Sequence, residues 1–277
     1  MNKRLAISFF EKGTRLLRRL PGGNRFCEQF LVTAVEAQAI ATHNGVHMVF
    51  GVPNALCRYR ASSFATKEPQ TLDWIDALPS GAILWDVGAN VGLYSVYAAM
   101  KRDAQVYAFE PSVFNLEQLA RNIHLNKLQR QITIVPVALS ARTGASLFKM
   151  TSTAWGGALS TFDRDFGYDG EALKEVFEYT TCGISMGDAI SNLGIPPPQF
   201  IKMDVDGIEH LILEGGKAVL QQVEGVLVEI NDDFTEQARQ ASQCLSEAGL
   251  TLHRKCDLGV GNQYNQWWIR EHAELPS

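Results

Sequence analysis

The chain has 277 residues, of which 46% are hydrophobic and 20% charged, which predicts one sizeable α/β domain with an appendage and no long disordered part. Its net charge of −5 argues against nucleic acid as a partner, because phosphate binding requires a basic face. The five scattered cysteines lack CxxC spacing, so they predict reduced thiols in a cytoplasmic protein rather than a zinc site or a disulfide framework.

Residues 1 to about 45 are predicted to be helical, with a break at Pro21-Gly22-Gly23-Asn24 and a second helix from about 25 to 41. In residues 1–20, apolar side chains recur among basic ones, and Glu11 is the only acid. This pattern fits a basic helix that lies on anionic lipid, and so a peripheral membrane contact. It fits equally a helix that packs on the main domain, and the core-like spacing of the apolar stripe favours that second interpretation.

Residues 47–60 alternate in hydropathy and predict a hairpin beside the main sheet. His43 and His47 have the spacing of a metal pair on a helix, but Gly45 lies between them and no acid is near, so a structural role is favoured. A helix is predicted within residues 62–80. The chain is therefore expected to divide into an N-terminal helical region with a hairpin, residues 1–80, and a main domain, residues 81–277.

The main domain is organised around residues 83–112, which predict a strand, a glycine loop, a helix and a second strand. Asp86 ends the first strand and Glu110 ends the second. Gly88 and Gly92 lack a Cβ, so the backbone can turn tightly and a ligand can lie close to it. The helix that follows directs free N–H groups at the loop. Glu110 is placed to accept hydrogen bonds from both hydroxyls of a ribose.

The loop pattern distinguishes two classes of nucleotide cofactor. A nicotinamide site requires G-x-G-x-x-G, whereas this loop is D-x-G-x-N-x-G, with an acid before the first glycine. An acid suits an ammonium group, which S-adenosylmethionine carries, and does not suit a pyrophosphate. S-adenosylmethionine is therefore the expected cofactor. The alternatives are an NAD-dependent oxidoreductase, a module that binds the cofactor without catalysis, and a solvated turn before an ordinary helix.

The rest of the domain is predicted as alternating helices and strands. Residues 144–183 are the least regular, with short strands near 147–150 and 179–182 and a long loop expected to join the acceptor site. The last two strands are expected to form an antiparallel pair. The remaining predicted elements are a helix at 112–126, strand 132–135, helix 186–193, strands 200–203 and 226–230, helix 235–248, and strands 250–254 and 266–270.

Because the carboxyl ends of parallel strands meet at one edge of a sheet, Asp86, Glu110, Asp204 and Glu229 are expected to converge. Methyl transfer to a hydroxyl requires a positioned general base. Asp204 is the first candidate, because it ends its strand at that edge. Lys202 projects to the same side but would need a lowered pKa. His210 is the third candidate, although a lone histidine on a partly apolar helix is more often structural.

The acids of this segment allow two other interpretations. Asp204, Asp206, Glu209 and Glu229 could hold Mg²⁺, which would acidify a hydroxyl directly, although no metal is the favoured prediction. Glu209 lies a helical turn away and could instead favour the helix N-terminus. The whole block could also be a capped helix start without chemistry.

Several motifs together resemble the FkbM family of S-adenosylmethionine-dependent methyltransferases. They are DVGANVGLYS, then FEPS with Asn115 and Asn122 downstream, then PVALS, FIKMDVDGIE and VEIN. The resemblance runs from about Ile83 to Asn231, is weaker between Lys149 and Phe200, and is most specific in the IK-x-D-V-[DE]-G-x-E block.

The resemblance implies a doubly wound, seven-stranded Rossmann-like sheet and O-methylation of a hydroxyl on a sugar, a glycan or another hydroxylated acceptor. Ala138 would offer only backbone contacts, to the adenine ring. The loop and the resemblance together predict cofactor contacts at Asp86, Gly88, Ala89, Asn90, Gly92, Tyr94, Ser95, Glu110, Pro111, Ser112, Asn115 and Ala138.

Overall fold

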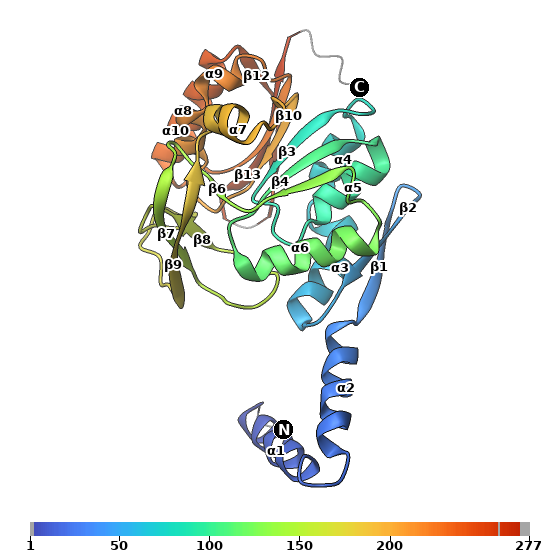
Figure 1. The fold of residues 1–277 in the computed structure, drawn as a ribbon. Helices are drawn as coiled ribbons and strands as arrows, with labels where there is room; N and C mark the ends of the chain where they lie inside the picture. The colour runs from blue at the N-terminus through green and yellow to red at the C-terminus, as the bar shows by residue number, and fades with distance from the viewer. Residues whose placement is uncertain (1–2, 260, 272–277) are drawn as a thin grey trace.

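A seven-stranded central sheet dominates the computed structural model, which describes residues 3–259 and 261–271 (Figure 1). Its strand order is β12-β13-β11-β10-β3-β4-β5. The strands are β3 (Ile83–Val87), β4 (Gln105–Phe109), β5 (Ile132–Val135), β10 (Phe200–Met203), β11 (Gly225–Asn231), β12 (Leu250–Asp257) and β13 (Gln263–Arg270).

The topology confirms the predicted doubly wound methyltransferase sheet. The strands from β11 to β5 are parallel, and β13 pairs antiparallel with both β11 and β12. The order of the strands along the chain reverses between β3 and β10, which lie side by side. In open α/β sheets, ligands bind at the carboxyl ends of the strands beside such a reversal. The loops after β3 and β10 are therefore where a site is expected.

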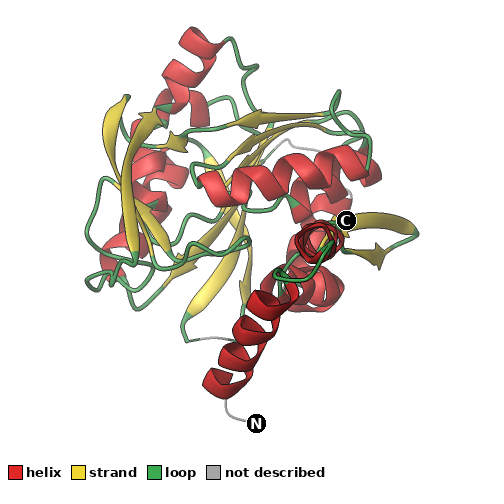
Figure 2. Ribbon diagram, turned by 60° about the horizontal axis from the view of Figure 1, so that its bottom comes forward, coloured by secondary structure: helices red, strands yellow, loops and turns green. Residues whose placement is uncertain are grey.

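Helices cover both faces of the sheet, so hydrophobic residues are buried on each side (Figure 2). Leu84 faces one core and its neighbour Trp85 the other, as the alternation of a strand requires. The first face is covered by α3 (Ala55–Lys67), α4 (Pro69–Asp76), α5 (Leu93–Arg102) and α6 (Val113–Leu125). The second is covered by α7 (Met186–Leu193), α8 (Glu209–Gly215), α9 (Lys217–Leu220) and α10 (Thr235–Glu247).

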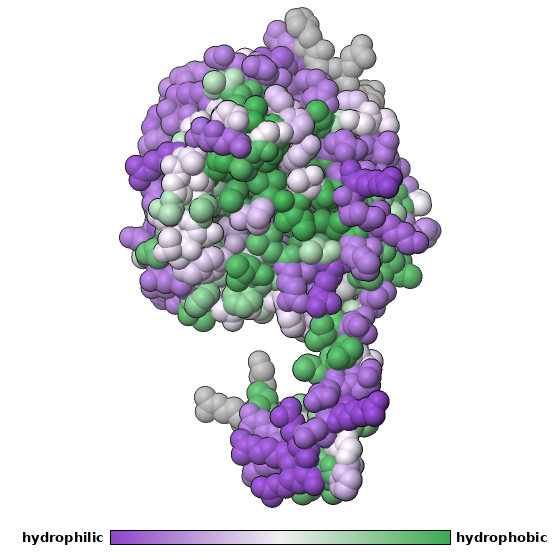
Figure 3. All heavy atoms as spheres, viewed as in Figure 1, coloured by the Kyte–Doolittle hydropathy of each residue, from purple (hydrophilic) through white to green (hydrophobic). Residues whose placement is uncertain are grey.

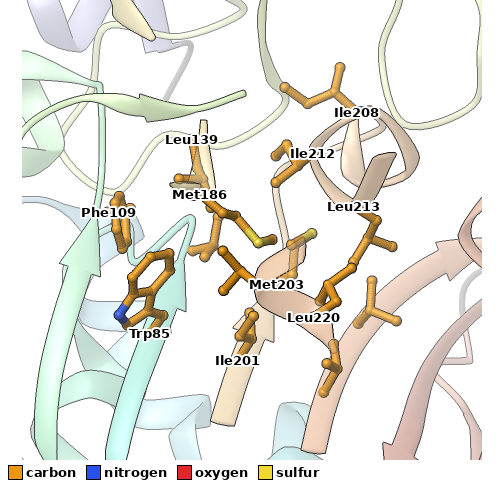
Figure 4. Packing of buried hydrophobic residues seen from close by; sticks show 14 of the residues in the cluster. Trp85, Phe109, Leu139, Met186, Ile201, Met203, Ile208, Ile212, Leu213 and Leu220 are labelled. Carbon is orange, nitrogen blue, oxygen red and sulfur yellow. The ribbon is translucent and has the colours of Figure 1, made fainter. Parts of the chain in front are cut away.

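Buried residues from β3, β4 and β10 pack together in the second core (Figure 4). Trp85 of β3 and Phe109 of β4 pack with ring centroids 4.9 Å apart. Ile201 and Met203 of β10 lie beside them and are no more than 1% exposed. Fully burying such a side chain stabilises the fold by about 1.5–3 kcal/mol. The ends of β3, β4 and β10 are therefore rigidly placed relative to one another.

A second sheet of four strands lies at one side of the central sheet. Its order is β6-β9-β7-β8, and β7 and β9 form its long antiparallel pair. The sequence predicted parts of β7 and β9 as short strands but did not predict that they form a sheet. The bounds are β6 (Ala138–Leu139), β7 (Gly144–Met150), β8 (Ser160–Phe162) and β9 (Phe177–Ile184).

The region before the central sheet corrects several predictions. The first helices are α1 (Lys3–Leu17) and α2 (Gly23–Val35), and the helix expected to reach residue 41 ends at Val35. A hairpin of β1 (Gln38–His43) and β2 (Val46–Gly51) follows, so the hairpin predicted at residues 47–60 is displaced. Its turn is Asn44-Gly45, with φ of 42° and 80°. Asn-Gly is the strongest short hairpin signal, because both residues adopt positive φ, and it outweighs the helical spacing around it.

The helix predicted within residues 62–80 is two helices, α3 and α4, which meet at Glu68-Pro69. His43 and His47 are not a helical pair, because they lie on the two strands of the hairpin. The hairpin and both helices share a core with α5 and β4, so the core continues across the predicted domain boundary at residues 80 and 81.

The helices α1 and α2 stand away from the rest of the molecule as an arm (Figure 1). Residues 1–2 of the predicted first helix lie outside the described residues. The expectation that the apolar stripe of this helix packs on the main domain is wrong, because Leu5, Phe9 and Phe10 are 61–80% exposed. Within residues 3–259 and 261–271, no helix has the length and apolar content needed to cross a bilayer.

Candidate functional site

The glycine loop after β3 lies against the ends of β4 and β10. The N–H groups of Gly88 and Ala89 both donate to the carbonyl of Phe109, each at 3.0 Å. Gly88 has a φ of 79°, and a Cβ there would lie 1.9 Å from the carbonyl oxygen of Asp204. Gly88 is therefore required for the close approach of two loops, in addition to the ligand access that the sequence suggested.

Glu110 lies buried at the end of β4. Its two carboxylate oxygens accept hydrogen bonds from the backbone N–H groups of Asn90 and Ser112, both at 2.8 Å. Burial raises the pKa of Glu110 to about 7, and these two backbone donors partly offset that effect. Glu110, Pro111 and Asn115 line a small cavity of about 60 Å³ together with the glycine loop. A ribose at this carboxylate is compatible with that position.

A larger cavity of about 360 Å³ adjoins the small one. The residues that line both are Gly88, Asn90, Ala158, Asp204 and Asp206. Ala89, Tyr94 and Lys202, all predicted site residues, line the larger cavity, as does Glu229. The structure thus brings residues from the ends of β3, β4, β10 and β11 to one edge, as the sequence predicted.

Five of the predicted cofactor residues line neither cavity: Asp86, Gly92, Ser95, Ser112 and Ala138. Asp86 is 1% exposed, accepts a 2.6 Å hydrogen bond from the Ser95 hydroxyl, and lies beneath the glycine loop. The carboxylate contacts Ser95 and the ammonium group of Lys202, and its predicted contact with the ammonium group of the cofactor stays a prediction. Ala138 is buried in β6, where it pairs with Gly183 of β9. Gly92 and Ser112 are the N-cap residues of α5 and α6.

Lys202 lies between two acids. Its Nζ is 3.5 Å from a carboxylate oxygen of Asp86 and 3.6 Å from one of Asp204, and it lies 5.3 Å from the ring centroid of Tyr94. Burial lowers the pKa of Lys202, but the charges of Asp86 and Asp204, with further acids of the cavity, outweigh burial and raise it. Lys202 is thus an ammonium group, which is the opposite of what a general base requires.

The acids after β10 have different surroundings. Glu209 is 1% exposed and accepts hydrogen bonds from the backbone N–H groups of Val205 and Gly207, so it braces this turn. Asp206 accepts a 2.7 Å hydrogen bond from the Leu159 N–H, and burial, followed by the charge of Asp204, raises its pKa to about 6. Asp204 is 31% exposed and faces both cavities.

No group of three or more His, Cys, Asp or Glu side chains is arranged to hold a metal ion among residues 3–259 and 261–271. Glu209, one of the four acids considered for Mg²⁺, is already engaged by backbone donors. Burial raises the pKa of Glu229 well above its ordinary value, which favours its neutral form. His210, the third base candidate, lies outside both cavity linings, and burial lowers its pKa to about 4.

Three charged residues of the larger cavity were not identified from the sequence. Arg60, Lys67 and Glu68 come from α3 and the residue after it, and they line the larger cavity. Glu68 is 4% exposed and pairs with Lys67 at 2.6 Å. Burial raises its pKa, but the charge and hydrogen bond of Lys67, with smaller contributions from Lys202 and Tyr94, together outweigh burial and lower it. A charged residue at a helix boundary is common, so no local pattern marks Glu68 as a cavity residue.

The loop at residues 151–159 closes over the junction of the two cavities. Asn115 donates to the Gly157 carbonyl at 3.1 Å and accepts from the Gly156 N–H at 3.0 Å. Asn90 donates to the same Gly157 carbonyl at 2.7 Å, and Arg60 donates to the Gly156 carbonyl at 2.8 Å. The sequence assigned this loop to the acceptor site, and Ala158 lines both cavities.

The sequence profile described as "Methyltransferase FkbM domain" matches residues 86–255, which is more than half of the chain. This chain belongs to the FkbM family of methyltransferases. Its FkbM domain contains the glycine loop, Glu110 and Asp204. Membership of this family argues against the alternative interpretation of the glycine loop, an NAD-dependent oxidoreductase.

Two methyltransferases are similar to this chain in sequence, and one solved structure was aligned with it. The hexuronic acid methyltransferase AglP of Haloferax volcanii is 28% identical over 190 residues, which are 66% of this chain and 71% of that protein. The 31-O-demethyl-FK506 methyltransferase FkbM of Streptomyces tacrolimicus is 24% identical over 175 residues, 56% of this chain and 67% of that one. The crystal structure of a methyltransferase FkbM from Methylobacillus flagellatus aligns with a TM-score of 0.44 at 14% identity, covering 69% of this chain and 44% of that longer chain.

Proposed function

We propose that this FkbM-family protein transfers a methyl group from S-adenosylmethionine to a hydroxyl of a sugar. The observation that carries the proposal is the position of Asp204. It is a partly exposed carboxylate at the junction of two adjoining cavities, one beside Glu110 and one whose lining includes several charged side chains. A methyl donor and a hydroxyl acceptor must meet at such a junction for an in-line transfer.

The smaller cavity would hold the ribose of the cofactor. Glu110 is buried beside it, and its carboxylate would accept hydrogen bonds from the ribose hydroxyls. The backbone of the glycine loop can approach a ligand closely, because Gly88 has no side chain. When bound, S-adenosylmethionine supplies an electrophilic methyl group on a sulfonium.

The larger cavity fits a polar acceptor. Its lining carries the cationic side chains of Arg60 and Lys67 together with Glu68 and Gln263, and such a set can hydrogen-bond several hydroxyls. Lys67 is already paired with Glu68, so the guanidinium of Arg60 would be the group that attracts the carboxylate of an acidic sugar. The description of AglP as a hexuronic acid methyltransferase supports this acceptor class.

Asp204 accepts the hydroxyl proton in the proposed reaction. Lys202 is fixed between Asp86 and Asp204, so its ammonium group orients the Asp204 carboxylate and balances its charge. Asp206 is a less suitable base, because one of its oxygens already accepts the N–H groups of Leu159 and Ser160.

The test is single-turnover methyl transfer to a panel of neutral and acidic glycosides at saturating S-adenosylmethionine. Asp204→Asn keeps the size of the side chain and removes its basicity, so the rate should fall about 10²–10⁴-fold while cofactor affinity changes little. A chelator should leave the wild-type rate unchanged. An Asp204→Asn rate within threefold of wild type would refute the assignment of the base. Cofactor binding without transfer to any acceptor would favour a module that binds without catalysis.

A further inference from the structure

The arm formed by α1 and α2, residues 3–35, exposes large apolar side chains. In α1 these include Leu5, Phe9, Phe10 and Leu16, each at least 61% exposed, and in α2 Phe26 and Phe30, at 61% and 57%. Figure 3 shows hydrophobic and hydrophilic residues close together on the arm, which stands clear of the body. A concentration of large exposed apolar side chains indicates a site of interaction with a partner or a membrane.

The apolar residues of each helix share a face. Leu5, Phe9 and Leu16 are spaced four and seven residues apart, so they lie along one side of α1. Lys12, seven residues after Leu5, lies at the edge of this side, and Arg15 lies farther round the helix. In α2, Phe26 and Phe30 are again four residues apart. Each helix of the arm therefore presents an apolar stripe beside polar positions.

The arm is basic although the whole protein is acidic. Residues 1–35 contain seven Lys or Arg and two Glu, whereas the complete chain has a net charge of −5. Basic residues beside exposed Phe and Leu are typical of helices that lie in the surface of a membrane with anionic lipids. We propose that the arm binds the surface of an anionic lipid bilayer, with its apolar stripes among the acyl chains and its basic residues at the headgroups.

Charge complementarity favours a bilayer over a second copy of the chain. Pairing two arms along their apolar stripes would bring two basic segments together, which is unfavourable. An anionic bilayer provides both the negative charge and the apolar environment. The inference depends only on the arm and not on the proposed methyl transfer, so the failure of one would leave the other unaffected.

The experiment is flotation of the full-length chain with vesicles of 70% phosphatidylcholine and 30% phosphatidylglycerol, and with pure phosphatidylcholine vesicles. Wild type should float with the anionic vesicles at low salt and be released at high salt, because salt screens the headgroup charge. Phe9→Ser with Phe10→Ser should reduce vesicle binding at least about tenfold, and Arg15→Glu with Arg19→Glu should do the same. All four side chains are exposed, so circular dichroism and thermal unfolding should be unchanged.

Two control variants make comparable changes at exposed positions on the body. Leu252→Ser alters an exposed leucine of β12, and Arg130→Glu with Lys174→Glu reverses two exposed charges; both should bind within twofold of wild type. Wild type that stays unbound at low salt would overturn the proposal, as would equal binding to both vesicle types. Ultracentrifugation that finds dimers broken by the arm variants, without vesicle binding, would identify a second copy as the occupant instead.

Discussion

At the scale of single residues, the site depends on charges that are buried together. Lys202 lies between Asp86 and Asp204, and the three side chains come from the ends of two adjacent strands. Removing one member of such a set leaves an uncompensated charge and is strongly destabilising, by about 3–5 kcal/mol. Lys202→Met therefore tests stability before it tests catalysis. Asp204→Asn is the cleaner probe of the reaction, because Asp204 is 31% exposed and Lys202 keeps Asp86 as a partner in that variant.

Glu110 gives a prediction about pH. Burial raises its pKa to about 7, so its carboxyl group is mostly protonated at pH 6 and mostly ionised at pH 8. The ionised form accepts hydrogen bonds from ribose hydroxyls more strongly. The affinity for S-adenosylmethionine should therefore rise about tenfold from pH 6 to pH 8.

Calorimetry across this range measures the affinity of wild type and of Glu110→Gln. The variant should bind at least tenfold more weakly at pH 8, since a charge-assisted hydrogen bond contributes about 1.5–3 kcal/mol, and its affinity should not change with pH. A wild-type affinity that is flat between pH 6 and pH 8 would contradict this role for Glu110.

Two glycines with the same backbone conformation provide a matched comparison. Gly45 and Gly88 have φ of 80° and 79°, but a Cβ at Gly45 meets nothing within 4 Å, whereas one at Gly88 lies 1.9 Å from the Asp204 carbonyl. Gly45→Ala should cost about 1–2 kcal/mol, the strain of a left-handed residue alone. Gly88→Ala should cost more than about 4 kcal/mol or prevent folding. Urea unfolding measures both, and equal losses would show that the contact with Asp204 is unimportant.

At the scale of elements, the site is assembled by a loop that has no regular structure. Residues 151–159 are held by side chains from α3, the glycine loop, α6 and the turn after β10. The two cavities meet beneath this loop. The loop therefore helps to shape both cavities. Substitution of the side chains that hold it should affect the binding of both the cofactor and the acceptor.

The strongest test of this loop is Asn115→Ala. Asn115 is 4% exposed, and its removal leaves the Gly156 N–H without that acceptor and the Gly157 carbonyl without one donor. The free energy of unfolding should fall by about 1–3 kcal/mol, and protease cleavage near Trp155 should become faster. Glu117→Ala is the control, because it removes only exposed contacts, a hydrogen bond from Trp155 and an ion pair with Arg121, and should cost less than about 1 kcal/mol. Equal effects of the two variants would argue against anchoring by Asn115.

At the scale of the whole molecule, the arm and the body are nearly independent. The buried core begins at Ala41, and Gly23 is the one buried residue assigned to α2. Stability comes mainly from burial of apolar area, and the arm buries little.

A chain that begins at Glu36 should therefore keep its unfolding free energy within about 1 kcal/mol of the full chain. Urea unfolding of both chains provides the measurement. A loss above about 3 kcal/mol would mean that the arm packs on the body in solution.

The sequence alone determined the succession of strands and helices along the main domain, the glycine loop and the acids at the strand ends. These features are local, since a turn requires glycine within a few residues and strand spacing is visible along the chain. Asp86, Glu110 and Asp204 could therefore be assigned to one edge of the sheet before the structure was known. The Asn44-Gly45 turn was also visible in principle, because its signal is two residues long.

Only the tertiary structure decided which of these side chains reach a cavity. Asp86 ends β3 as predicted, yet it faces Lys202 and Ser95 beneath the loop. Arg60 and Glu68 line the larger cavity because α3 packs beside the glycine loop, a contact between residues far apart in sequence. The exposure of the apolar stripe on α1 likewise depends on whether that helix packs against a distant part of the chain. Side-chain partners and burial depend on contacts between distant segments, and no local pattern records those contacts.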